Sequence, residues 1–192
     1  CIRDRLGLLN TCLVVAEYPI KASGLAFEGQ LADRYTYRNE RCLPREFTMT
    51  RAERVSGWQD AQARLAGGHD PEQSALVEDN RILDGPTGWH PAVVQDRSPN
   101  HMTVHAEATE PALLVLSEVW YPGWQAEVDG IEQPMVRVNG LLRGVYLAPG
   151  THTIVWRYRP ASLRWGAAIS LSALAGSLLF LLWARRRREA AP

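Results

Sequence analysis

The sequence predicts a mainly β protein: an antiparallel β-sandwich with one short helix, followed by a single C-terminal transmembrane α-helix. Two observations carry this prediction. Short apolar and alternating stretches, separated by turn dipeptides such as Asp129–Gly130 and Asn139–Gly140, recur up to residue 159. Strands and turns at such spacing are typical of a sandwich. Beyond them, residues 165–184 carry no charged side chain, which gives a stretch long enough to cross a bilayer.

The first predicted elements precede the short helix. An apolar run over residues 6–18 suits the end of a helix and an entering strand. Residues 34–39 alternate, with Tyr35 and Tyr37 on one face, and residues 46–49 form the next strand.

One short helix is expected after residue 55. Ser56 is placed to cap it, because Ser side chains accept hydrogen bonds from the first backbone N–H groups of a helix. Trp58, Ala61 and Leu65 fall on one helical face, and the glycine pair at residues 67–68 ends the helix.

From residue 75 to the membrane segment, the pattern predicts strands and turns with no further helix. Asp129–Gly130 supplies a hairpin turn, because Gly tolerates the positive φ that such a turn needs. Asn139–Gly140 and Pro149–Gly150 are expected to repeat it. The candidate strands are residues 75–78, 92–95 and 102–106, the apolar stretch that starts at Pro111, and residues 124–128 and 151–159.

The C-terminal apolar segment is predicted to span a membrane as a helix over residues 163–184. At about 1.5 Å of rise per residue, the path from Trp165 to Trp183 covers roughly 27 Å, close to the thickness of the hydrocarbon layer. A Trp at each end suits the two membrane interfaces. The alternative is a buried core helix of a soluble protein.

Arginines predict the orientation of this span. Residues 185–188 are four consecutive arginines, whereas Arg164 alone directly precedes the span. By the positive-inside tendency, residues 185–192 are a cytoplasmic basic tail and residues 1–160 are an extracytoplasmic β-rich domain at the bacterial cytoplasmic membrane. A tail-anchored protein would have the opposite topology, with the arginines on the wrong side.

Composition excludes some partners. The chain has 21 basic and 21 acidic residues, so its formal net charge is zero and it lacks the cationic face on which nucleic-acid binding depends. Cys12 and Cys42 could pair in an oxidising compartment, with Cys1 left over, or all three could be inert thiols. Inert thiols are the favoured interpretation.

An ordered series of residues carries a resemblance to a known family. Between residues 113 and 160 the series comprises Tyr121-Pro122-Gly123-Trp124, Asp129-Gly130, Asn139-Gly140, Pro149-Gly150 with His152, and Tyr158-Arg159-Pro160. Followed by an apolar span, it resembles the C-terminal end of the YfhO family of bacterial multi-pass membrane proteins. The Leu43-Pro44-Arg45 step and residues 6–15 resemble further segments of that family.

The resemblance implies a function. Members of the family look like C-type glycosyltransferases, with many transmembrane helices, a lipid-phosphate-linked sugar donor and a catalytic carboxylate in an early extracytoplasmic loop. By resemblance, this chain is the exported domain and final helix, with an accessory role in acceptor or glycan binding or in structural support. The catalytic half would precede Cys1. The alternative is a free-standing, single-pass module that binds glycan or protein at the bacterial cell surface.

The expected partners are the lipid bilayer, upstream transmembrane helices of the same or another protein, and a lipid-linked sugar or cell-envelope glycan. Ala168, Ser172 and Gly176 recur every four residues and make a small-residue stripe that lets another helix approach. In an Ala-rich helix, such a stripe could equally arise by chance.

Three aromatic residues and one arginine are the candidate glycan-binding residues. Trp120, Tyr121 and Trp124 offer flat rings on which the apolar faces of sugars stack. Arg45 is included because it could face a phosphate or pair with a buried carboxylate. The competing interpretation, somewhat favoured, is that Trp120 and Trp124 fill the sandwich core.

No catalytic residue, metal ligand or cofactor is predicted. His101 and His105 share a strand face, but no third ligand is placed to complete a metal site. His152 is expected to be a core histidine bonded to a backbone carbonyl. Glu127 points to solvent, which argues against a pair of catalytic carboxylates.

Overall fold

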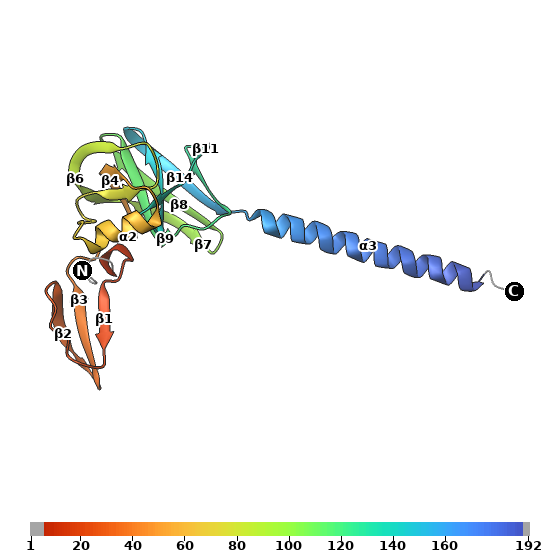
Figure 1. The fold of residues 1–192 in the computed structure, drawn as a ribbon, viewed down its shortest axis with the longest axis horizontal. Helices are drawn as coiled ribbons and strands as arrows, with labels where there is room; N and C mark the ends of the chain where they lie inside the picture. Colours follow the sequence, from red (N-terminus) through yellow and green to blue (C-terminus); the bar gives the residue numbers. More distant parts are fainter. Residues whose placement is uncertain (1–5, 190–192) are drawn as a thin grey trace.

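The computed structural model describes residues 6–189, in which a β-rich body carries a projecting three-stranded sheet and a long C-terminal helix (Figure 1). The predicted mainly β fold with a C-terminal apolar helix is confirmed. The strands are β1 (Leu13–Ala16), β2 (Leu25–Leu31), β3 (Arg34–Asn39), β4 (Glu46–Arg54), β5 (Ala75–Val77), β6 (Leu83–Pro91), β7 (Val93–Ser98), β8 (His101–Ala108), β9 (Ala112–Val119), β10 (Trp124–Val128), β11 (Ile131–Gln133), β12 (Val136–Val138), β13 (Leu142–Leu147) and β14 (Gly150–Tyr158). The helices are α2 (Trp58–Ala66) and α3 (Ala161–Glu189).

Two sheets form the sandwich. The outer sheet has the strand order β11-β10-β14-β8-β7, and the central sheet has the order β5-β12-β13-β9-β4-β6. Ile154 and Trp156 of the outer sheet pack against Leu114 and Leu116 of the central sheet. All four side chains are buried, so this layer is a continuous apolar core.

The central sheet has a second apolar face. Because side chains alternate along a strand, Leu113 and Val115 of β9 point away from the outer sheet. They join a core cluster that includes Phe47 of β4 and Ala61 and Leu65 of α2. The body therefore has three layers, with the central sheet buried on both faces.

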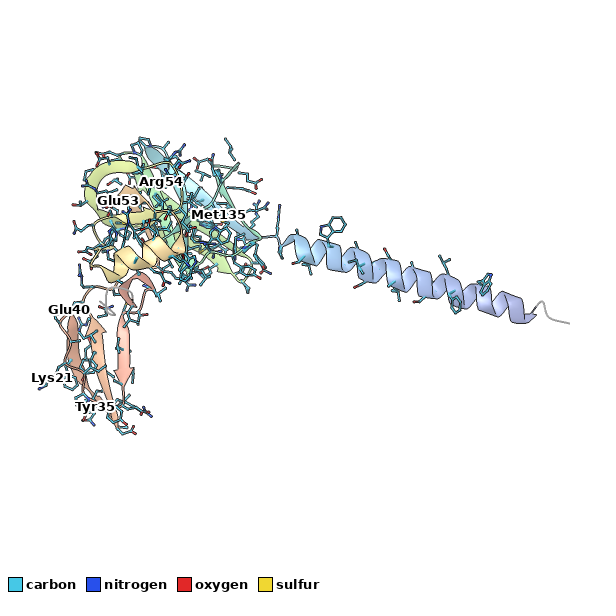
Figure 2. All side chains as sticks on the ribbon, viewed as in Figure 1. Lys21, Tyr35, Glu40, Glu53, Arg54 and Met135 are labelled. Carbon is cyan, nitrogen blue, oxygen red and sulfur yellow. A yellow bond between two sulfur atoms is a disulfide. The ribbon has the colours of Figure 1, made fainter. Side chains whose placement is uncertain are left out.

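The arm sheet, of order β1-β3-β2, projects from the body (Figure 1). Figure 2 shows Lys21 and Tyr35 on this projection. A disulfide joins Cys12, next to β1, to Cys42, shortly after β3, with their Cα atoms 5.0 Å apart. The inert-thiol interpretation is therefore wrong for this pair, and Cys1 lies outside the described residues.

Strand register explains why the two cysteines meet. Leu13 pairs with Arg38 in the antiparallel β1–β3 ladder. The backbone N–H of Asn39 then donates to the carbonyl of Cys12 at 2.8 Å. This register, which spacing along the chain does not reveal, brings the start of β1 beside the turn that follows β3.

Of the predicted hairpin turns, Asp129–Gly130 joins paired strands and Pro149–Gly150 does not. Asp129–Gly130 forms the predicted hairpin, with φ values of 52° and 81° and with Val128 paired to Ile131. Pro149–Gly150 does not form a hairpin, because β13 belongs to the central sheet and β14 to the outer sheet. That step instead crosses between the two layers.

The cap of α2 also differs from the prediction. The N-cap residue is Gly57, which makes no side-chain capping bond. Ser56 bonds Asp60 instead, through its backbone N–H at 2.9 Å from the carboxylate. Ala61 and Leu65 are buried as expected, whereas Trp58 at the start of the helix is about half exposed.

Helix α3 extends away from the body (Figure 1). Its segment Ala161–Phe180 is long and apolar enough to cross a membrane, and the described structure buries none of it. Large apolar side chains such as Leu163, Ile169 and Leu178 are exposed along it. A contiguous exposed apolar surface of this kind is typical of a segment that contacts lipid or another protein. In this structure α3 is not a core helix.

Candidate ligand-binding cleft

Arg45 and Trp124, two of the predicted site residues, line the same open cleft of about 440 Å³. Arg45 directly precedes β4, and Trp124 begins β10. The volume lies in the range of small-molecule sites. The other residues that line the cleft are Arg97, Ser98, Pro99, Met102 and Glu118.

The cleft lies at the end of the body from which α3 starts. The backbone N–H of Tyr158 donates to Asn100, in the loop beside the cleft, at 2.9 Å. The N–H of Arg159 donates to the carbonyl of Gly123 at 2.6 Å. Gly123 has a φ of 104°, and a Cβ there would lie 2.9 Å from the Cα of Pro160. The β10 wall of the cleft is therefore fitted closely against the chain that enters α3.

Two glutamates and three arginines form a network beside the cleft. Glu118 is bonded by both Arg45 and Arg143, and Glu46 is bonded by Arg97. Burial raises the pKa of Glu46, an effect that the charges of Arg97 and Arg45 oppose. With three guanidinium groups and two carboxylates, the network has a net charge of one positive unit. Arg45 and Arg97 are partly exposed, so they are accessible to an anion.

Arg143 is the buried member of this network. Only 1% of its surface is exposed, and its guanidinium carbon lies 3.7 Å from the ring centroid of Trp124 and 5.5 Å from that of Trp156. Burial lowers the pKa of Arg143, and the charge of Glu118 opposes this shift. Cation–π contact with two indoles compensates in part for the loss of water.

These contacts define what Trp124 can offer to a ligand. One face of its indole is covered by Arg143, and its ring centroid lies 5.3 Å from that of Tyr158. The side chain is half buried and packs against the sandwich core. It thus belongs partly to the core and partly to the cleft wall, whereas the tryptophan that fills the core completely is Trp156.

The other two predicted aromatics do not line the cleft. Trp120 is half buried, with the guanidinium of Arg137 over its ring at 4.5 Å from the centroid. Tyr121 is 58% exposed, and its ring centroid lies 6.4 Å from that of Tyr158. The structure thus brings Arg45 and Trp124 together and leaves Trp120 and Tyr121 outside.

Sequence reasoning did not find Arg97, Glu118 or Arg143 as site residues. A charged residue in a strand is normally assigned to the solvent face, and nothing in the local pattern around Arg143 shows that both faces of β13 are covered. The strand pairing alone reveals the network.

The histidines have structural partners. His152 bonds the carbonyl of Ala148 at 2.8 Å through Nε2, as predicted, and the carboxylate of Asp129 at 2.7 Å through Nδ1. The bond to Asp129 raises the pKa of His152. His105 bonds Gln95 at 2.7 Å. Among the described residues, no group of three or more His, Cys, Asp and Glu side chains is arranged to hold a metal ion.

Comparison with known proteins identifies one family. Residues 89–170 match the family described as bacterial membrane protein YfhO. The matched region runs from within β6 to the first part of α3 and includes Trp124 and Arg143 but not Arg45. No curated protein and no solved structure matches the chain.

Proposed function

Since the match over residues 89–170 supports membership of the YfhO family, we propose that this chain is an accessory part of a membrane protein of glycosyltransferase type. Residues 1–160 form its extracytoplasmic binding domain, and α3 is its final membrane helix. The domain binds a sugar that carries a negatively charged group, and it has no catalytic site of its own. The single observation that carries this proposal is the meeting of Arg45 and Trp124 in one cleft beside the start of α3.

The chemistry of the cleft favours an anionic sugar. Arginine guanidinium groups bind phosphate and carboxylate oxygens through pairs of parallel hydrogen bonds. Arg45 and Arg97 are both partly exposed at the cleft. The exposed part of Trp124 adds an apolar surface for the C–H groups of a sugar ring.

The position of the cleft suits a lipid-linked ligand. If α3 spans the bilayer, the end of the body from which it starts faces the membrane surface (Figure 1). A sugar held by a lipid phosphate presents its charged group at that level. The four arginines at residues 185–188 favour the orientation in which this surface is the extracytoplasmic one.

The carboxylates of the cleft support a binding role. Glu118 and Glu46 are each engaged by arginine, Glu118 by two of them. A general acid or base needs a carboxylate that is free to exchange a proton with substrate. These two are committed to ion pairs that hold the arginines in place.

A binding experiment tests the proposal. The full chain is placed in nanodiscs of uncharged phosphatidylcholine and titrated with glucose 1-phosphate and with glucose while its tryptophan fluorescence is followed. We expect glucose 1-phosphate to bind more tightly than glucose, and its affinity to fall as the salt concentration is raised. Arg45→Gln should weaken binding about tenfold, the effect of one lost charged hydrogen bond.

The matched control is Arg51→Gln, on the strand β4 that Arg45 directly precedes. Arg51 is similarly exposed and also pairs with a carboxylate, that of Asp84, but it lies outside the cleft. It should leave the affinity unchanged. Equal affinities for glucose 1-phosphate in the wild-type chain and in Arg45→Gln would refute the proposed site.

A further inference from the structure

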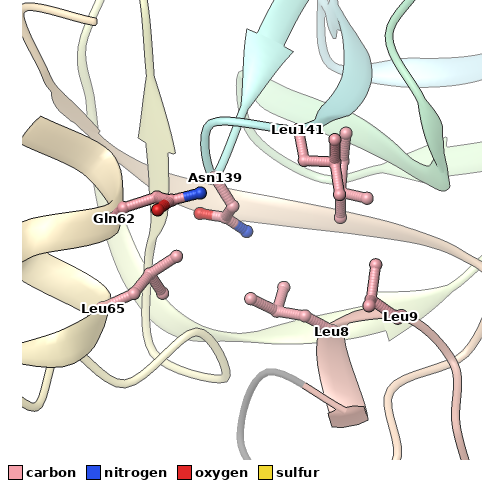
Figure 3. A pocket seen from close by; sticks show the side chains of 7 residues that line it. Leu8, Leu9, Gln62, Leu65, Asn139 and Leu141 are labelled. Atoms are coloured by element: carbon pink, nitrogen blue, oxygen red, sulfur yellow. The ribbon is translucent and has the colours of Figure 1, made fainter. Parts of the chain in front are cut away.

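A second concavity, of about 140 Å³, opens on the α2 side of the central sheet. Three segments that are distant in the sequence form its walls: the turn that precedes β1, α2, and the turn between β12 and β13 (Figure 3). Its walls are mostly aliphatic, and none of the described residues that line it is charged. The lining includes Leu8, Leu9, Gln62, Leu65, Asn139 and Leu141.

Asn139 places one unsatisfied hydrogen-bond donor in this apolar pocket. The residue is only 5% exposed, and its Nδ2 atom is buried without a hydrogen-bond partner. Figure 3 shows the amide nitrogen directed into the space between Leu65, Leu8 and Leu141. Buried donors are nearly always bonded, so an unpaired donor at the wall of a cavity is a place where an acceptor atom of a ligand or of a water molecule fits.

Two hydrogen bonds fix the orientation of this amide. Oδ1 of Asn139 accepts from the backbone N–H of Leu76 at 2.9 Å, and the N–H of Asn139 donates to the carbonyl of Leu76 at 2.7 Å. A flipped amide would put an N–H group against the Leu76 N–H. Nδ2 must therefore point away from β5 and toward the pocket.

The turn that carries Asn139 is held firmly. Asn139 and Gly140 have φ values of 51° and 74°. A Cβ at residue 140 would lie 3.2 Å from the Cβ of Ala61 and 3.3 Å from the carbonyl of Trp58, so the turn packs tightly on α2. The donor is thus preorganised for a ligand.

We propose that this pocket binds an aliphatic side chain of a polypeptide segment, whose neighbouring backbone carbonyl accepts a hydrogen bond from Nδ2 of Asn139. The aliphatic walls select a side chain such as leucine, and the unpaired amide NH₂ group of Asn139 selects a carbonyl oxygen. A charged group is disfavoured, because none of the described lining residues offers a countercharge and burial of a lone charge is costly.

The surroundings favour a polypeptide over the acyl chain of a bilayer lipid. The pocket is formed by α2, by the turn that precedes β1 and by the turn between β12 and β13, so it adjoins the start of the arm sheet. Leu9, Leu13 and Val15 are each about half exposed, so apolar surface continues from the pocket wall into β1. Strand β1 is also an edge of the arm sheet. An extended segment could pair with such an edge.

The test uses the full chain in phosphatidylcholine nanodiscs, with ¹³C-labelled leucine methyl groups observed by NMR. The probe is N-acetyl-leucine N-methylamide. We expect saturable shifts at the methyl groups of the pocket leucines, with a Kd on the order of 1 mM for a ligand of this size. N-acetyl-glycine N-methylamide, which lacks the side chain, should cause no such shifts.

Two variants separate the two parts of the recognition. Asn139→Asp keeps an oxygen for Leu76 and tolerates the positive φ, but it replaces the donor, so binding should weaken about tenfold. Leu141→Trp fills the pocket and should abolish binding. Ile131→Trp places the same indole on the β10–β11 hairpin, outside the pocket, and should bind as the wild type does.

Four outcomes would overturn the proposal. Wild-type affinity in a folded Asn139→Asp chain would show that the donor is not used, and wild-type affinity in Leu141→Trp would show that the pocket is not the site. Binding of methyl hexanoate without binding of the leucine probe would assign the pocket to an acyl group. Self-association that Leu141→Trp abolishes, in a chain that does not bind the probe, would assign it to a second copy.

Discussion

The buried pair of Arg143 and Glu118 makes the sharpest prediction about stability. Removal of Glu118 leaves the cation of Arg143 in the core, 1% exposed and without its carboxylate. Removal of Arg143 leaves Glu118, which is about one quarter exposed and keeps Arg45 as a partner. The two halves of the pair are therefore unequal, and Glu118→Gln should destabilise the domain more than Arg143→Met.

The magnitudes follow from the environment of each group. Breaking a buried ion pair by removing one partner costs about 3–5 kcal/mol, and the partial exposure of Glu118 places Glu118→Gln near 3 kcal/mol. Arg143→Met loses a charged hydrogen bond worth about 1.5–3 kcal/mol and its cation–π contacts. It also removes a desolvated charge with two unbonded nitrogen atoms, Nε and Nη1. The net cost should be about 1 kcal/mol.

Thermal unfolding of the full chain in nanodiscs, followed by tryptophan fluorescence, measures the difference. At about 2–4 °C per kcal/mol for a chain of this size, Glu118→Gln should lower Tm by about 6–12 °C and Arg143→Met by about 2–4 °C. The control is Glu127→Gln, which breaks the more exposed pair with Arg157 and should cost at most about 1 kcal/mol. A larger loss in Arg143→Met than in Glu118→Gln would refute the reasoning.

Two further predictions concern the disulfide and the His152 pair. Cys12→Ser with Cys42→Ser opens a loop with a sequence separation of 30 and should destabilise the fold by about 3–4 kcal/mol, measured as a lower Tm and faster proteolysis of the arm sheet. Because the pKa of His152 is raised in the folded state, this residue stabilises the fold at pH values below its unfolded pKa of 6.5, and the stabilisation is lost as pH rises through the folded pKa. Because the pKa of Asp129 is lowered, this residue stabilises the fold at pH values above its unfolded pKa of 3.8, and the stabilisation is lost as pH falls through the folded pKa. The Tm difference between wild type and Asp129→Asn should therefore be largest between pH 4 and pH 6.5, and a difference that is flat with pH would contradict the pairing.

Local patterns predicted the four longer strands of the outer sheet, β7, β8, β10 and β14, but neither β11 nor the order in which the strands pair. Side chains alternate along β14, so Ile154 and Trp156 share a face, and both are buried in the sandwich core. The Asp129–Gly130 turn could be predicted because its two residues are the ones that tolerate positive φ. In these segments local preference and tertiary packing agree.

Strand β6 could not be predicted in the same way. It contains Gly85, Pro86, Gly88 and Pro91, which individually signal turns. It nonetheless pairs with β4 as the edge strand of the central sheet. Proline is tolerated at an edge, because no further strand there needs a hydrogen bond from the N–H that proline lacks. Only the position in the sheet distinguishes this edge strand from a loop.

The candidate site was predicted in part for a related reason. Arg45 and Trp124 were selected by side-chain chemistry, and β4–β9 pairing brings Arg45 to Glu118 at the cleft. The ion pair of Arg143 with Glu118 could not be predicted, because it depends on the central sheet being covered on both faces. A local pattern predicts which residues share a face, but not whether the opposite face is also buried.

The same network explains how the cleft could accept an anion without leaving a buried charge unpaired. Glu118 bonds Arg45 through one carboxylate oxygen and Arg143 through the other. When an anionic ligand engages Arg45, Glu118 still has Arg143, and Arg143 still has its carboxylate and its two indoles. The ligand therefore displaces only a partly exposed pair, which contributes at most about 1 kcal/mol. The buried pair therefore holds the cleft residues in the geometry that the proposed function requires, with or without a ligand at Arg45.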